Sequence, residues 1–143
     1  MNDRYLYRAK RKNWRELPKE MWWADGYYAF IDNHHYIYTG NLCNGGLYVV
    51  AERFEIDITT LCTCTGLKDK NGNLIWENDI LVGYIDDIYP ENPTYTRVIW
   101  YKNGFYTKEK GSYDILPLDE FDEKHFEVCG NIFDNPELLE VGE

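Results

Sequence analysis

A mainly β protein is predicted by three features of this sequence. Strand-like segments recur about every ten residues, β-branched and aromatic residues fill them, and amphipathic helical periodicity is scarce. Gly, Asn, Asp or Pro separates the segments, as in a β-meander, sandwich or small barrel. We predict an N-terminal β-meander over residues 1–62, followed over residues 63–143 by an SH3-like small β-barrel with a short C-terminal helical turn. The alternative is that both parts form one compact unit.

The expected strands are the runs richest in Tyr, Phe, Trp, Ile and Val. These runs are residues 5–8, 27–31, 35–38, 47–50, 54–58, 80–82, 96–101, 105–107 and 126–129. Their aromatic and β-branched side chains fit a pleated, half-buried surface. Short helical turns are expected at Trp14–Met21 and Pro136–Glu140, where Pro136 occupies the first helical position.

Two hairpin turns are predicted in the C-terminal half. Asn103-Gly104 lies between strand-like runs, and these residue types adopt the two positive φ angles of a type I′ turn. Asn71-Gly72 has the same place between residues 65–67 and 74–76. Ile75, Trp76, Ile80 and Leu81 are then expected to form a pair of strands that enters the core.

The net charge of −10 is unevenly distributed along the 143 residues. Met1–Trp23 contains seven Lys/Arg and three Asp/Glu, whereas from Asp114 onward there are ten acids and a single basic residue, Lys124. Charges of opposite sign can steer one end of a molecule toward the other end of a second copy. An acidic chain is repelled by bulk nucleic acid. The charge distribution therefore favours a protein partner over DNA.

No cofactor, metal site or membrane segment is predicted. No apolar run approaches the roughly 18 residues of a membrane-spanning helix, and no apolar signal sequence is recognised, so we expect a cytoplasmic protein.

The cysteines are Cys43, Cys62, Cys64 and Cys129. Cys62 and Cys64 would share one face of a strand, but the Cys-x-x-Cys spacing of structural zinc sites is missing, so buried, inert thiols are expected.

Catalytic residues are not predicted either. The acid pairs Asp86-Asp87, Asp119-Glu120 and Asp122-Glu123 are expected to be solvated surface. Asp69–Asn73 resembles a calcium loop, but Leu74 and Ile80 stand where the helix-loop-helix type needs Gly and Glu, so a capped turn is the better interpretation. No thiol or hydroxyl has the flanking motif of an activated nucleophile. An enzyme is thus the least favoured class of function.

Three segments resemble the YopX family of phage and prophage proteins. They are TGLKDKNGNLIWENDIL (Thr65–Leu81), VCGNIFDNPELL (Val128–Leu139) and the basic stretch YRAKRKN (Tyr7–Asn13). The resemblance implies a phage or prophage origin and a mainly β structure, and it implies no defined activity. Two residues depart from the family pattern: Cys64 stands in place of Tyr, and Asn78 in place of Gly. Asn tolerates the left-handed conformation, so the turn is expected to persist.

A non-catalytic protein-binding or self-assembly module is the function that we predict. The chain has more aromatic surface than one small β layer can bury, and interface cores are enriched in Tyr, Trp and Met. The candidate interface residues are Met21, Trp22, Trp23, Tyr27 and Tyr28. We expect a homo-oligomer in the host cell, with a host or phage protein as a further partner. The competing interpretation is that these rings fill the core of the monomer.

Nucleic-acid binding is the alternative function. Cations alternate with rings near the N-terminus, and small β-barrels pair stacking rings with phosphate-binding cations. The candidate residues are Arg8, Lys10, Arg11, Lys12 and Trp14. The competing interpretation is that these residues belong to the first strand, with basic side chains facing outward and apolar side chains facing the core.

Overall fold

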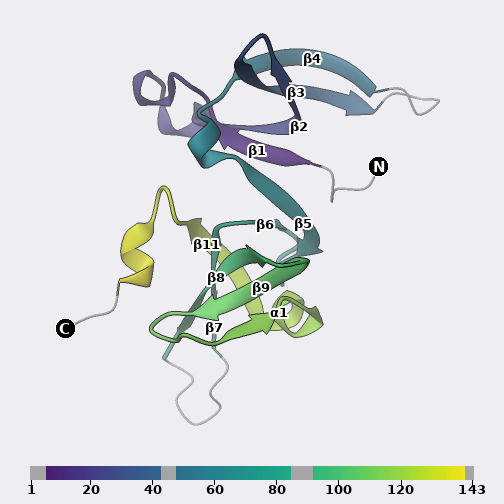
Figure 1. Cartoon of the computed structure of the whole chain (residues 1–143). Helices are drawn as coiled ribbons and strands as arrows, with labels where there is room; N and C mark the ends of the chain where they lie inside the picture. Colours follow the sequence, from purple (N-terminus) through teal and green to yellow (C-terminus); the bar gives the residue numbers. More distant parts are fainter. Residues whose placement is uncertain (1–5, 43–47, 85–91, 141–143) are drawn as a thin grey trace. The chain divides into compact units, whose positions relative to one another are not determined.

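The computed structural model describes residues 6–42, 48–84 and 92–140 and divides into two compact units, Met1–Cys64 and Thr65–Glu143 (Figure 1). The predicted mainly β structure is confirmed, since antiparallel sheets dominate both units. Cys43 and the pair Asp86-Asp87 lie outside the described residues. Across the described ranges, no helix has the length and apolar character needed to cross a membrane.

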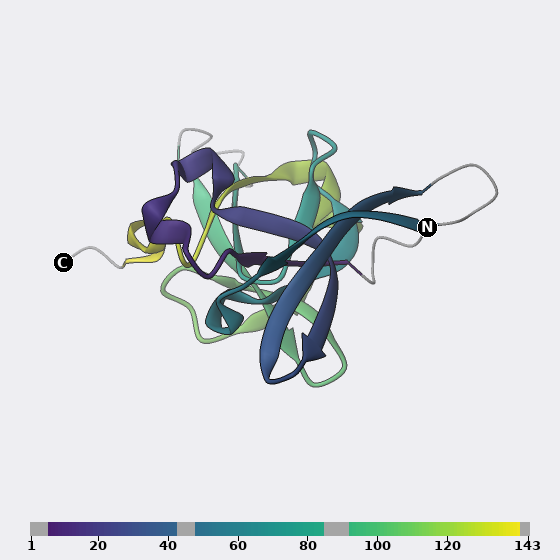
Figure 2. The same ribbon diagram turned by 90° about the horizontal axis from the view of Figure 1, so that it is seen from above.

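Unit 1 is built on an antiparallel sheet with the strand order β4-β3-β2-β1-β5. The strands are β1 (Tyr7–Lys10), β2 (Trp23–Ile31), β3 (His34–Leu42), β4 (Tyr48–Glu55) and β5 (Cys62–Lys68). Three short 3-10 turns join them: η2 (Trp14–Glu16), η3 (Lys19–Met21) and η4 (Ile58–Thr60). Figure 2 shows η2 and η3 next to each other at one end of β1 and β2.

The core of unit 1 is small and is closed by aromatic rings. Ala9, Ala24, Ile37 and Ile56 are buried, and half-buried side chains such as Tyr28 and Phe54 pack around them. Ala9 on β1 and Ala24 on β2 are small, and the rings that pack against this core come from β1, β2 and β4. Cys62 and Cys64 are fully buried on β5, as expected of inert thiols.

Unit 2 contains an antiparallel sheet with the strand order β10-β9-β8-β7-β11. Its elements are β6 (Leu74–Trp76), β7 (Asp79–Gly83), β8 (Thr94–Tyr101), β9 (Gly104–Glu109), β10 (Ile115–Pro117), α1 (Glu120–His125), β11 (Phe126–Asn131) and η5 (Pro136–Leu139). β6 lies beside the second half of β5. No strand pairing joins the edge strands β10 and β11 within the described ranges, so closure into an SH3-like barrel stays a prediction.

The predicted core strands of unit 2 are confirmed, since Ile75, Trp76, Ile80 and Leu81 are all buried. Asn78, in the tight turn between β6 and β7, has a φ of +71°, so the residue that replaces the family's glycine adopts the left-handed conformation. Its Oδ1 accepts a hydrogen bond from the guanidinium of Arg97 at 3.1 Å. Asn is therefore a workable substitute at this position.

The turn between β8 and β9 lies one residue earlier than predicted. Tyr101 pairs with Gly104, so the two loop residues are Lys102 and Asn103. Lys102 has a φ of +54°, whereas neither Asn103 nor Gly104 has a positive φ. This pattern is typical of a type II′ turn rather than type I′. The register is shared by six cross-strand pairs, from Thr96–Glu109 to Tyr101–Gly104, and together they override the local preference of Asn-Gly.

Replacing Lys102 with Gly is expected to stabilise the protein by about 0.5–1 kcal/mol, because Gly adopts a positive φ without the steric cost that a side chain incurs. Urea unfolding followed by circular dichroism measures this gain. Asn103→Gly is the matched control and should give no gain. Stabilisation by Asn103→Gly alone would contradict the observed register.

The Asn71-Gly72 turn also differs from the prediction. Gly72 has a φ of +85°, but Asn71 is not in the positive region. The loop is organised by the buried carboxylate of Asp69, whose Oδ1 accepts hydrogen bonds from the backbone N–H groups of Asn71 and Asn73, both at 2.9 Å. This is a longer, carboxylate-capped loop, in agreement with the predicted capped turn and not with a two-residue hairpin.

A true two-residue hairpin occurs where none was predicted. Ile31 pairs with His34 across the turn between β2 and β3. The loop residues Asp32 and Asn33 have φ angles of +51° and +66°, as a type I′ turn requires. Asp and Asn are the non-glycine residues that tolerate this conformation best.

Candidate functional site

Three tryptophans surround one buried lysine in unit 1, and we call Lys10, Trp14, Trp22 and Trp23 the tryptophan cluster. Lys10 is only 2% exposed. Its Nζ lies 3.9 Å from the ring centroid of Trp14, 4.6 Å from that of Trp22 and 5.7 Å from that of Trp23. The faces of indole rings attract a cation, and this attraction offsets part of the cost of removing the ammonium from water.

Local structure places these side chains together. Lys10 ends β1 opposite Trp23, which begins β2. The connection between the two strands carries Trp14 on η2 and brings Trp22 back at the end of η3, where the two rings meet edge to face at 4.8 Å. Trp22 Nε1 donates a hydrogen bond to the carbonyl of Leu17 at 2.9 Å. The cluster therefore holds the β1–β2 connection against the sheet.

The cations predicted to contact nucleic acid take part in contacts within unit 1. Lys10 is buried in the tryptophan cluster. The guanidinium of Arg11 lies 3.8 Å from the ring centroid of Phe54, and that of Arg8 lies 4.9 Å from a Trp23 ring. Lys12 forms an ion pair with Glu55 at 3.0 Å. Nucleic-acid binding stays a prediction, and the alternation of cations and rings has a structural role in this unit.

Of the predicted interface residues, Met21 is the exposed one. Trp22, Trp23, Tyr27 and Tyr28 are half-buried. Tyr28 packs on the core, and its hydroxyl lies 2.6 Å from Nδ1 of His35. Trp22, Trp23 and Tyr28 thus make contacts within unit 1, and an interface role for the five residues stays a prediction.

Two rings that are more exposed than these lie at the end of the β8–β9 hairpin, where only strand residues were predicted. Trp100 is 45% and Tyr101 is 47% exposed. Trp100 meets Phe105 edge to face at 4.9 Å, and Tyr101 meets Tyr106 at 6.1 Å. We call Trp100 and Tyr101 the hairpin aromatics.

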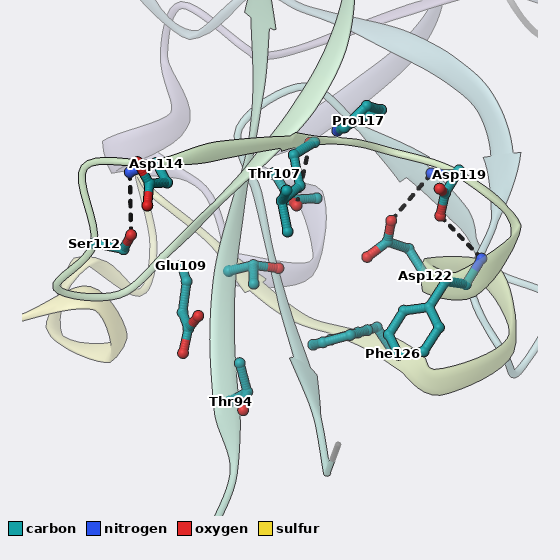
Figure 3. A pocket seen from close by; sticks show the side chains of 12 residues that line it. Thr94, Thr107, Glu109, Ser112, Asp114, Pro117, Asp119, Asp122 and Phe126 are labelled. Carbon is teal, nitrogen blue, oxygen red and sulfur yellow. Dashed lines mark hydrogen bonds between the residues drawn. The ribbon is translucent and has the colours of Figure 1, made fainter. Parts of the chain in front are cut away.

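A pocket of about 430 Å³ opens in unit 2 between β8, β9, β10 and α1 (Figure 3). Its lining contains four carboxylates, and we call it the acidic pocket. The carboxylates are those of Glu109, Asp114, Asp119 and Asp122. Leu116, Pro117, Phe121 and Phe126 supply apolar surface, and Ser112 and threonines from β8 and β9 complete the lining.

A capping box at the start of α1 turns one of these carboxylates inward. Asp119 accepts a hydrogen bond from the N–H of Phe121, and Asp122 accepts one from the N–H of Asp119, both at 3.0 Å (Figure 3). Asp122 is only 6% exposed. Burial raises the pKa of Asp122, and the nearby charge of Asp119 adds to this, while the hydrogen bond from the Asp119 N–H acts in the opposite direction.

The expectation that Asp122 is solvated surface is therefore wrong. The capping geometry explains the difference, because a residue three positions after the N-cap folds back onto the first turn. The spacing Asp119-x-x-Asp122 was the available signal. In the described part of the chain, no group of three or more His, Cys, Asp and Glu side chains is arranged to hold a metal ion.

Comparisons with known proteins identify the relatives of this chain. The family described as YopX protein matches residues 7–140. The crystal structure of protein EF1440 from Enterococcus faecalis has a similar fold, with a TM-score of 0.54 and 21% identity, over 94% of this chain and 96% of that one. No curated protein matches the sequence. Because the family match spans nearly the whole sequence, this chain belongs to the YopX family.

Proposed function

We propose that this YopX-family protein is a non-catalytic protein-binding module of phage or prophage origin that works as a homo-oligomer in the cytoplasm of the host cell. The observation that supports this proposal is the exposure of the hairpin aromatics, Trp100 and Tyr101. Large rings that remain half exposed to water gain free energy when a partner covers them. Trp and Tyr are also the residues most enriched at the centres of protein interfaces. Closure of the unit 2 sheet into an SH3-like barrel is part of the same proposal.

The charges of the two units support association between copies. Unit 1 has eight Lys/Arg and eight Asp/Glu, whereas unit 2 has seven and 17, so the entire net charge of −10 belongs to unit 2. Lys12, Arg15 and Lys19 are exposed on unit 1. Exposed cations on one copy can therefore approach the acidic unit of the next, which is the complementarity that head-to-tail assembly needs.

Light scattering at micromolar concentration and moderate salt is expected to show a defined multimer. The double variant Trp100→Ser/Tyr101→Ser should shift the mass toward the monomer, because it removes the aromatic surface that a second copy would cover. Far-UV circular dichroism should show that the variant stays folded.

Phe30→Ser is the matched control, since Phe30 is an exposed ring on β2 and belongs to unit 1, whereas the hairpin aromatics belong to unit 2. It should leave the mass unchanged. A wild-type protein that is monomeric under these conditions would remove the assembly part of the proposal.

A further inference from the structure

The acidic pocket has the charge of a cation-binding site. Its lining includes four carboxylates, and no Lys, Arg or His side chain is among the lining residues of the described chain. Unit 2 as a whole carries a charge of −10. Carboxylates gathered in a concave site with apolar walls concentrate a negative potential there and attract cations.

A buried hydroxyl without a partner lines the same pocket. Thr96 is 6% exposed, and its Oγ1 is buried without a hydrogen-bond partner in the described chain. Thr94 also lines the pocket and lies two positions earlier on β8, so the two side chains share one face of that strand. A buried polar group is normally paired, and a bound ligand or water is a common reason for an orphan.

Asp122 offers a second polar atom at this site. One of its carboxylate oxygens accepts the hydrogen bond from the Asp119 N–H, and Figure 3 shows the other pointing into the pocket. Burial has already removed most water from this side chain, and the cost of that burial appears as its raised pKa. A cation placed beside the second oxygen would recover the lost solvation as a charge-assisted hydrogen bond.

The exposed part of the lining is partly apolar. Leu116 and Phe121 are exposed large hydrophobic side chains, and the carboxylate-bearing residues Glu109, Asp114 and Asp119 are exposed beside them. The pocket thus combines the buried acceptors of Asp122 and Thr96 with exposed hydrophobic surface. A bare metal ion would use only the first of these features, whereas an amphipathic cation would use both.

We infer that the acidic pocket binds a primary ammonium group on an aliphatic chain, with the ammonium at Asp122 and Thr96 and the methylenes against Leu116 and Phe121. An ammonium has three N–H donors and no acceptor, which suits a carboxylate oxygen and a hydroxyl that both lack a donor. A lysine side chain of a partner protein and a free diamine have this chemistry. This inference goes beyond the proposed assembly and does not depend on it.

Titration calorimetry of the full chain with Nα-acetyl-lysine methylamide and with 1,5-diaminopentane tests this inference. At least one of the two probes should bind saturably, and the Nε-acetylated form of the lysine probe should bind about tenfold or more weakly, because it lacks the charge. Tighter binding of the lysine probe would assign the site to a protein partner, and tighter binding of the diamine would assign it to a free amine.

Two variants connect the binding to the pocket. Asp122→Asn removes the charge but keeps an oxygen that can accept the Asp119 N–H, and it should weaken binding about fivefold or more. Thr96→Val has nearly the same shape without the hydroxyl. It should weaken binding while leaving the thermal midpoint equal or higher, a combination that a purely structural role would not produce.

Glu137→Gln is the matched control, because Glu137 is an exposed acid of unit 2 that does not line the pocket. It should leave the affinity unchanged. Absence of saturable binding of both probes, or an equal loss in Glu137→Gln and Asp122→Asn, would overturn the inference. The pocket variants should keep the multimer, so this result and the light-scattering result can fail independently.

Discussion

Replacement of Trp22 with Ala is expected to destabilise unit 1 by about 3 kcal/mol. Three contributions are lost together: the contact with Trp14 at 4.8 Å, the hydrogen bond from its Nε1 to Leu17, and one of the rings around the Lys10 ammonium. The last contribution adds to the loss, because the ring supplies part of the cation–π attraction that offsets the burial of Lys10, which is only 2% exposed.

Urea unfolding followed by far-UV circular dichroism measures this change without relying on tryptophan fluorescence. Met21→Ala is the matched control, since Met21 is the preceding residue and is exposed, and it should cost less than about 1 kcal/mol. The same experiment decides between the two sequence interpretations of Trp22. Loss of the multimer with an unchanged unfolding curve would make Trp22 an interface residue and contradict its role in the tryptophan cluster.

Local sequence was sufficient to predict the β character and the core of unit 2. Ile75, Trp76, Ile80 and Leu81 are apolar residues next to a turn, and burial of such residues follows from composition and spacing alone. Asn78 could also be predicted, because the choice between left-handed and other conformations depends mostly on the residue itself. These features depend on interactions between near neighbours in sequence.

Turn registers were less predictable, because distant residues decide them. Asn103-Gly104 is a strong hairpin signal, but the pairing of Trp100 with Phe105 places the loop at Lys102 and Asn103. The six cross-strand pairs from Thr96–Glu109 to Tyr101–Gly104 contribute about 0.2–1 kcal/mol each, and together they offset the cost of about 1–2 kcal/mol for one non-glycine residue at positive φ. Local preference therefore loses to cross-strand packing.

The candidate sites were the least predictable, because they are assembled in three dimensions. Lys10 looks like a surface cation in the sequence, and only the return of η3 onto β1 buries it among indole rings. Asp122 looks like one of several surface acids, and the capping box buries it. Nothing in the sequence marked Thr96 as a site residue. Whether its hydroxyl finds a hydrogen-bond partner depends on the residues around it in the folded structure.

Asp69→Ala is expected to destabilise unit 2 by about 4 kcal/mol. The carboxylate of Asp69 accepts hydrogen bonds from three backbone N–H groups, those of Asn71, Asn73 and Val128, each at 2.9 Å. Alanine would leave all three donors without this acceptor, and a hydrogen bond to a charged group contributes about 1.5–3 kcal/mol. The bond to Val128 also connects the β5–β6 loop to β11, so its loss affects two parts of the unit.

The same carboxylate predicts how stability depends on pH. Burial acts to raise the pKa of Asp69, but the hydrogen bonds from Val128, Asn73 and Asn71 outweigh it, and the net pKa lies below the usual value of 3.8. The folded state therefore binds this proton less readily than the unfolded state. The contribution of Asp69 is fully present above the unfolded pKa and is lost as the pH falls through the lower, folded pKa.

The free-energy difference between wild type and Asp69→Ala should therefore be constant at neutral and mildly acidic pH and shrink below about pH 4. Urea unfolding at a series of pH values measures this difference. Asn71→Ala serves as the control in the same loop, because it removes only the exposed hydrogen bond to Glu127 and should cost about 0.5 kcal/mol or less. A difference that grew as the pH fell would mean that Asp69 is protonated more easily in the folded protein, and the carboxylate could not then be what holds the β5–β6 loop to β11.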